Sequence, residues 1–291
     1  MEELTNNEEY RHVRILLDEE QQRELLPAER LQEWQGKKLI FFGSKGEFGQ
    51  LVALAVFSVS VVHGEEMELE YIEVAMECQG EGLAQQLLDF CASSFKNSGI
   101  RSIYVKCVAS MDKVAGWYDF FRKGKFMPVL CCGHQLTYDV GDLRTCELMR
   151  YGTDLIGVFG AKLRKYETHL DTLVKQFLQQ HKGFLIRQGA YDPQYSRICW
   201  DEDQVKGVVC LKQMDEKTVV MTGCCVETDG NGKYLYAALL YSALRELCAV
   251  VDDDVRFVLQ LYRPVYYALV KKMLGEPGRD LIVQEYVRKL A

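Results

Sequence analysis

The chain has 291 residues, a formal net charge of −7 at pH 7, 48% hydrophobic and 26% charged residues. This length predicts two domains, each able to bury its own core, and the composition is that of an ordinary globular protein. The negative charge argues against a nucleic-acid partner, because counterion release requires a basic face. No apolar run approaches the roughly 20 residues that span a bilayer, so we expect no membrane partner either.

The N-terminal stretch MEELTNNEEYRH is acidic and polar, the opposite of a secretory or mitochondrial targeting segment, so we expect a cytoplasmic protein. The eleven cysteines are scattered and show no CxxC spacing, which indicates reduced thiols that act as small core residues. The only metal-like cluster is Cys131, Cys132 and His134. Neighbours on one strand alternate faces and no second ligand pair follows, so we expect no metal site.

The first half reads as alternating strands and helices. Asp18 stands where an N-cap would open a helix after a strand over residues 10–17. Three β-rich runs separated by glycine-containing turns then predict an antiparallel meander within residues 39–76. The remaining predicted elements are a helix over residues 83–96, a strand over 103–108, a helix over 113–123 and a strand over 128–140. This order indicates an α/β layer with a mixed sheet.

The second half repeats the order. A long helical tract over residues 153–181 begins it, and the later predicted elements are strands within 196–214 and 217–227, a helix over 234–247, a strand over 255–262 and a helix over 266–274. Gly80 and Gly82 lie 150 residues before Gly230 and Gly232, and each pair is followed by helix, strand and helix. The chain is therefore interpreted as a tandem duplication with domains 1–142 and 143–291.

The stretch QGEGLA, residues 79–84, lies where a predicted strand ends and a helix begins. Each glycine costs about 1 kcal/mol inside an element, so two together indicate a backbone requirement. A glycine-rich turn that opens a helix presents unpaired N–H groups at the positive end of the helix dipole, which suits a diphosphate. The alternative is a tight turn in which glycine only supplies a positive φ. Rossmann and Walker loops are excluded, because an antiparallel meander precedes the stretch and no GK[ST] follows it.

These residues resemble the GCN5-related N-acetyltransferases, or GNAT family, whose signature Q/R-x-x-G-x-G/A follows the fourth strand. Gln79, Gly82 and Ala84 fill the signature positions, and the strand before, the helix after and the upstream meander agree with the family. The resemblance covers residues 10–140 well and the second half faintly. It implies an α/β (α+β) fold, with a mixed, mostly antiparallel sheet flanked by helices, occurring twice in tandem.

The resemblance implies an N-acetyltransferase that moves acetyl from acetyl-CoA to a primary amine of a small molecule or peptide, by direct attack in a ternary complex. Ile72, Glu73 and Val74 would pair with the pantetheine arm, and the Val74 amide would polarise the thioester carbonyl. The loop that would hold the diphosphate of coenzyme A consists of Gln79, Gly80, Glu81, Gly82, Leu83, Ala84 and Gln85.

Acyl transfer to an amine needs a base for the amine proton. Glu68, Glu70 and Glu73 on the predicted fourth strand are the candidates. Glu68 and Glu70 share the parity of Val74, so alternation predicts that they lie on its face. A carboxylate beside an apolar cleft has its pKa raised toward neutrality, which suits a base. The alternative is that alternating glutamates mark a solvated face of the sheet.

The reaction also needs an acid to reprotonate the leaving thiolate. Many family members supply a Tyr in the helix before a Gly-Phe pair. Alignment on Phe126 puts Phe121 at that position, which departs from the family pattern. Tyr118 lies three residues earlier on nearly the same helix face, so it is either the acid or an amphipathic core residue.

The second half departs further from the signature. Asp229 replaces the expected Gln or Arg, and Tyr234 replaces a small residue, so we expect this half to bind no coenzyme A. It would complete the acceptor cleft or provide an interface, for example in a homodimer. Phe121 also leaves open a noncatalytic acyl-CoA-binding module with a regulatory or interaction role. A scaffold of two vestigial folds is the third reading.

Overall fold

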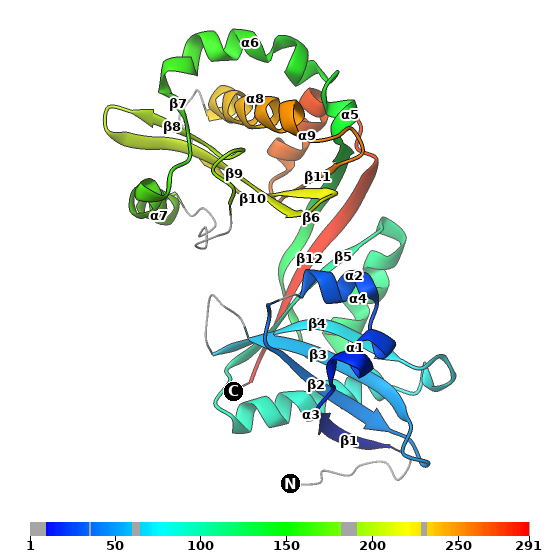
Figure 1. Ribbon diagram of the computed structural model, residues 1–291. Coiled ribbons are helices and arrows are strands. Elements are labelled where there is room, and N and C mark those ends of the chain that lie inside the picture. The colour runs from blue at the N-terminus through cyan, green and yellow to red at the C-terminus, as the bar shows by residue number, and fades with distance from the viewer. Residues whose placement is uncertain (1–9, 35, 60–64, 182–190, 228–231, 291) are drawn as a thin grey trace. The chain divides into compact units, whose positions relative to one another are not determined.

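The computed structural model describes residues 10–34, 36–59, 65–181, 191–227 and 232–290. The chain folds into two compact units, one made of Met1–Cys132 with Val283–Ala291 and the other of Gly133–Ile282 (Figure 1). Strand β6 (Met127–Asp139) leads from the first unit into the second, and β12 (Arg279–Lys289) leads back. The predicted boundary lies between residues 142 and 143, whereas the two units divide within β6, after Cys132, and residues 283–291 return to the first unit.

The first unit contains a mixed sheet in the order β1-β2-β3-β4-β5-β12-β6. Strands β1 to β4 form an antiparallel meander, and β4 runs parallel to β5, as the sequence predicts. Its other elements in chain order are β1 (Arg11–Ile15), α1 (Glu19–Leu25), α2 (Ala28–Glu33), β2 (Leu39–Lys45), β3 (Leu51–Val59), β4 (Glu66–Val74), a 3-10 turn (Met76–Cys78), α3 (Leu83–Asn97), β5 (Ser102–Ala109) and α4 (Met111–Lys123).

Helix α1 begins with the predicted cap. The Asp18 carboxylate accepts from the Gln21 N–H at 2.9 Å, and the Gln21 side chain accepts from the Asp18 N–H at 3.1 Å. The single helix expected before β2 is instead two helices, α1 and α2. Pro27 lacks an N–H and disfavours helical geometry in the preceding residue, and Leu26 accordingly has extended backbone angles of φ −120° and ψ 143°.

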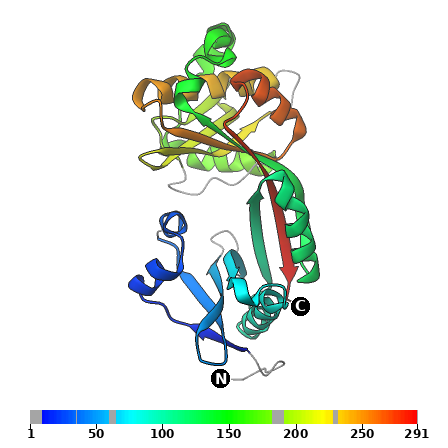
Figure 2. The same ribbon diagram turned by 90° about the vertical axis from the view of Figure 1, so that its right-hand side faces the viewer.

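Each face of this sheet carries its own core. Helix α3 buries an i, i+4 stripe against one face, together with Phe121 of α4 and Tyr286 of β12. The opposite face packs Leu26 and Trp34 of the α1–α2 segment against side chains of β2 and β3. Figure 2 shows β12, in red, beside β5 in this unit. No strand was predicted over residues 279–289, where β12 lies.

The second unit has the same plan, with a sheet in the order β6-β11-β10-β9-β8-β7. Only β10 and β11 are parallel among the pairs described there, at the place that β4 and β5 hold in the first unit. Its elements are α5 (Val140–Leu143), α6 (Glu147–Phe159), β7 (Leu163–Lys165), α7 (Asp171–Gln180), β8 (Arg197–Asp201), β9 (Gln204–Asp215), β10 (Thr218–Val226), α8 (Gly232–Val250), β11 (Arg256–Leu261) and α9 (Pro264–Leu274), with 3-10 turns at Gly160–Lys162 and Thr168–Leu170.

The predicted helical tract over residues 153–181 is wrong in its middle. Leu163–Lys165 forms β7 and pairs with β8, so the tract is divided into α6 and α7. Pairing with a neighbouring strand overrides the local helical pattern here. Within the part of the chain that the structure describes, no helix is both long and apolar enough to cross a bilayer.

Candidate active site

Strands β4 and β5 pair over only part of their lengths. Their parallel register runs from Glu66↔Ser102 to Leu69↔Val105, although β4 continues to Val74 and β5 to Ala109. Beyond Leu69 and Val105 the two strands therefore part. An opening between parallel strands leaves main-chain groups on its edges that a ligand can meet.

The main chain of β4 directs two residues into this opening. The Ala75 N–H donates to the Val52 carbonyl of the β3 side at 2.8 Å, and Val74 stands opposite Ala53. Hydrogen-bonded and non-bonded pairs alternate along an antiparallel ladder, so the N–H and C=O of Val74 and of Ile72 point away from β3. The N–H of Glu73, between them, points toward β3.

Gln79 links the end of β4 to the glycine loop. Its side-chain Nε2 donates to the Val74 carbonyl at 3.0 Å, across the intervening 3-10 turn. The carbonyl lies on the edge of β4 that has lost β5, so this bond satisfies an acceptor that the sheet leaves unpaired. The side chain of Gln79 thus orders the last peptide of β4, next to the amide that sequence reasoning assigned to the thioester.

The two glycines of the loop have the conformation that only glycine adopts readily. Gly80 has φ +85° and Gly82 has φ +79°, and a Cβ built on either would meet no other atom within 4 Å. Gly82 is the N-cap of α3, and no side chain caps that terminus. The positive end of α3 therefore opens into space beside a backbone that a phosphate can approach closely.

The other predicted loop residues have differing roles. Leu83 is buried in the core beneath α3, and Ala84 is half-buried. The Gln85 N–H donates to the Gly82 carbonyl at 3.0 Å, and its side-chain Nε2 donates to the Phe120 carbonyl at 2.8 Å. Gln85 therefore ties α3 to α4. The carboxylate of Glu81 accepts a hydrogen bond from Tyr10 at 2.6 Å.

A β-bulge in β4 corrects the predicted faces of the glutamates. The register with β3 shifts between Val56↔Tyr71 and Phe57↔Leu69, so Glu70 is the extra residue. Side-chain alternation consequently shifts by one along the strand. Before the bulge, Leu69 packs in the α3-side core, and after it Ile72 and Val74 pack against that same core.

Glu68 and Glu70 therefore lie on the face opposite Val74, not on its face as parity predicted. This is the face of α1 and α2, where Tyr71 packs beside Trp34. The Oε1 of Glu70 accepts from Lys37 Nζ at 2.5 Å and from Ser58 Oγ at 2.6 Å, and its side chain is 9% exposed. Glu68 also interacts with other groups, and in the sheet it is paired with Ser58 of β3 and with Tyr104 of β5.

The third glutamate, Glu73, lies on that face too. The Tyr71 hydroxyl donates a hydrogen bond to the Glu73 carboxylate. Burial is the larger cause that raises the pKa of the Tyr71 phenol, and this hydrogen bond is the second. Lys37, Ser58 and Tyr71 were not among the residues that the sequence analysis singled out. Lys37 precedes β2, Ser58 lies on β3 and Tyr71 follows the bulge in β4, so no sequence motif indicates that they lie together.

The aromatic residues of α4 divide into buried and exposed ones. Phe121, at the position of the family's Tyr, is 1% exposed and stacks on Tyr286 with ring centroids 5.0 Å apart. Tyr118 is 42% exposed. Of these two residues Phe121 is therefore the core residue, whereas Tyr118 is partly exposed to solvent.

The corresponding region of the second unit differs at its glycine. β10 and β11 also part early, after Val220↔Val258. A Cβ on Gly232 would lie 2.5 Å from the Glu227 carbonyl oxygen, so this glycine fills a close backbone contact rather than facing open space. Tyr234 is exposed. Asp229 and Gly230 lie outside the described residues.

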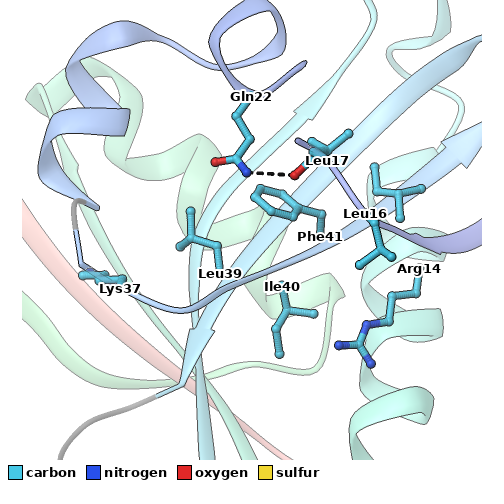
Figure 3. A pocket seen from close by; sticks show the side chains of 9 residues that line it. Arg14, Leu16, Leu17, Gln22, Lys37, Leu39, Ile40 and Phe41 are labelled. Carbon is cyan, nitrogen blue, oxygen red and sulfur yellow. Dashed lines mark hydrogen bonds between the residues drawn. The ribbon is translucent and has the colours of Figure 1, made fainter. Parts of the chain in front are cut away.

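A separate cavity of about 260 Å³ lies where β1 leaves β2, beyond the last pair Ile15↔Phe41. Figure 3 shows Phe41 beneath the hydrogen bond from Gln22 Nε2 to the Leu17 carbonyl, which is 2.9 Å long. None of the predicted site residues lines it. Among the described residues, no group of three His, Cys, Asp or Glu side chains is placed to hold a metal ion. The side chains of Cys131 and Cys132 lie outside that description.

One protein-family model matches part of the chain. The model of the acetyltransferase (GNAT) family matches residues 7–121. None of the curated proteins matches the chain in sequence.

Several solved structures share the fold. A GCN5-related glucosamine N-acetyltransferase region of a fungal multi-domain GH3 beta-N-acetylglucosaminidase has TM-score 0.68 and 14% identity, over 95% of this chain and 38% of that chain. This chain thus spans well under half of that protein. A tandem GNAT protein from the clavulanic acid biosynthesis pathway has TM-score 0.60 and 10% identity, over 97% and 99% of the two chains.

A GCN5-related N-acetyltransferase from Sphaerobacter thermophilus has TM-score 0.55 and 12% identity, over 90% of this chain and 85% of that chain. At these identities the likeness concerns the fold. The strand order, the parting of β4 from β5 and the family match agree with one another. Residues 7–121 therefore belong to the GNAT acetyltransferase family, in a chain with the mixed α/β fold of tandem GNAT proteins.

Proposed function

We propose that the chain is an N-acetyltransferase that transfers acetyl from acetyl-CoA to a primary amine by direct attack in a ternary complex. The observation that carries this is the parting of β4 from β5 beyond Leu69 and Val105, beside a loop of left-handed glycines that face open space. Coenzyme A combines a diphosphate with an extended arm that carries amides. The loop suits the first and the unpaired edge of β4 suits the second.

The main chain of β4 would stabilise the transition state. The N–H of Val74 points into the opening and would donate to the thioester oxygen as negative charge develops there. A fixed donor of this kind contributes about 3 kcal/mol. The loop amides beside Gly80 and Gly82 would hold the diphosphate, and Ile72 would pair with the pantetheine arm.

Glu68 and Glu70 are the proposed bases on the acceptor side. Both face α1 and α2, opposite the core beneath α3, so the proposal places the acceptor amine on that side. Lys37 and Ser58 fix the Glu70 carboxylate in one orientation. Replacing the working base by Gln should lower kcat by about 10²- to 10⁴-fold while the affinity for coenzyme A stays the same. The proposed acid is Tyr118, which is partly exposed.

A noncatalytic acyl-CoA-binding module is the second candidate, because Phe121 replaces the family's Tyr and is buried in the core. Both functions require coenzyme A to bind, but only an enzyme releases free thiol when an amine is present. Cofactor binding alone therefore does not separate the two candidates.

The deciding experiment incubates the full chain with acetyl-CoA and a panel of primary amines, and follows thiol release and acetylated product. Glucosamine belongs in the panel, because a protein region of similar fold is described as a glucosamine N-acetyltransferase. Peptides with a free amine form its second arm. Amine-dependent release that Glu68→Gln or Glu70→Gln abolishes supports the enzyme. Binding of coenzyme A without turnover of any amine supports the module.

For the second unit we propose that no coenzyme A binds. The enclosed position of Gly232 supports this, because a Cβ on it would meet the Glu227 carbonyl oxygen, whereas a Cβ on Gly82 would face open space. Calorimetry should therefore give one coenzyme A per chain, and a stoichiometry of two would contradict the proposal.

A further inference from the structure

A hydrogen bond connects the start of β1 to the glycine loop. Tyr10 donates its hydroxyl to Glu81 Oε2 at 2.6 Å, although the residues lie 71 positions apart. The hydrogen bond to Glu81, followed by one to Cys78, raises the pKa of the Tyr10 phenol. The ring of Tyr10 packs against the core on the α3 side, which fixes the position of the donor.

Glu81 occupies an unfavourable position for an anion-binding loop. It stands between Gly80 and Gly82, whose open, left-handed backbone forms the proposed diphosphate site. A carboxylate close to a diphosphate opposes binding through like-charge repulsion. The loop therefore needs the Glu81 side chain to point elsewhere.

The fold shows where Glu81 points. Tyr10 immediately precedes β1, and in the order β1-β2-β3-β4-β5 that strand lies across the sheet from β5. His12, on β1 itself, contacts Phe90 of α3 with ring centroids 5.7 Å apart, so β1 lies beside this helix at that point. The bond to Tyr10 consequently directs the Glu81 carboxylate toward the start of β1, which lies at the opposite end of the strand order from β5.

We propose that Tyr10 is a positioning residue that sets the affinity for coenzyme A, because its hydroxyl holds the Glu81 carboxylate away from the diphosphate. The inference rests on the proposed function, since it requires coenzyme A at the loop. Tyr10 acts only through Glu81 and touches neither the thioester nor the acceptor.

The test is a double-mutant cycle on the full chain, with coenzyme A as the calorimetric probe. Tyr10→Phe keeps the packed ring and removes the hydroxyl, and should weaken binding by about three- to tenfold as Glu81 is released. Glu81→Gln should bind as tightly as the unmodified chain or more tightly. In the Tyr10→Phe/Glu81→Gln variant the effect of losing the hydroxyl should vanish, because no charge is left to hold.

Salt and a matched control complete the test. At about 1 M salt, where the Debye length is about 3 Å, the effect of Tyr10→Phe should shrink. Tyr191→Phe is the control, because Tyr191 also donates to a carboxylate, Asp171 at 2.8 Å, but in the second unit. It should leave the affinity for coenzyme A unchanged.

Two results would overturn the inference while leaving the proposed function in place. One is unchanged coenzyme A affinity in Tyr10→Phe. The other is an equal loss in the Glu81→Gln background, which would mean that the hydroxyl acts through packing or by direct contact. Failure of the unmodified chain to bind coenzyme A would instead overturn the proposed function, and this inference with it.

Discussion

Replacing Gly82 by Ala tests the glycine loop directly. At φ +79° an added Cβ is strained, and the left-handed conformation costs about 1–2 kcal/mol in any residue other than glycine. The Cβ would meet no protein atom within 4 Å, so it projects into the space assigned to the phosphates. Losing one charge-assisted hydrogen bond there costs about 1.5–3 kcal/mol, or about 10- to 100-fold in the Kd for coenzyme A.

Gly99 provides the matched control at the other end of α3. Its φ is +80° and a Cβ on it would also meet nothing within 4 Å. Gly99→Ala should therefore lower the free energy of unfolding as much as Gly82→Ala does. Urea denaturation measures that loss, and calorimetry with coenzyme A measures the affinity. Equal affinity for coenzyme A in both variants would refute the reasoning, because backbone strain would then be the only effect at Gly82.

Three further predictions concern stability. Gly152→Ala should lower the free energy of unfolding of the second unit by about 1–3 kcal/mol in a urea titration, because the added Cβ would clash with the Tyr241 ring. Gly157 is exposed on the same helix, so Gly157→Ala should be neutral or stabilising in the same titration. Tyr236→Phe should raise the free energy of unfolding, because the buried hydroxyl of Tyr236 has no hydrogen-bond partner among the described residues; a decrease would reveal a bound water or ligand. Burial raises the pKa of Cys107 to about 12, so above pH 9 the unfolded chain binds fewer protons than the folded one. Stability should then fall between about pH 9 and 12, by at most about 1.4 kcal/mol per pH unit for this thiol, and less steeply in Cys107→Ala.

Much of the fold follows from local patterns in the sequence. The meander, α3 and the glycine loop were predictable because strand alternation, helical periodicity and the positive φ of glycine are local properties. The division of the first helix is local too, because Pro27 marks it. By contrast, β7 was read as helix and β12 was not seen, since both are strands only through pairing with segments far away in the chain.

The candidate site shows the same limit. Main-chain positions such as Val74 could be inferred from the end of a strand and the loop after it. The face of Glu70 could not, because one bulged residue reverses the alternation and depends on how β3 and β4 pair. The contacts of Lys37 with Glu70 and of Tyr10 with Glu81 join residues 33 and 71 positions apart, which no spacing rule captures.

Because β12 returns to the first unit, that unit is synthesised first but its sheet is completed last. Residues Val283–Ala291 belong to the unit that the ribosome makes first, and the Leu290 N–H closes on the Arg101 carbonyl at 2.8 Å. During synthesis the sheet of the first unit therefore lacks the strand beside β5 until the whole second unit has been translated. Truncation within residues 283–290 would for the same reason destabilise the unit that carries the glycine loop.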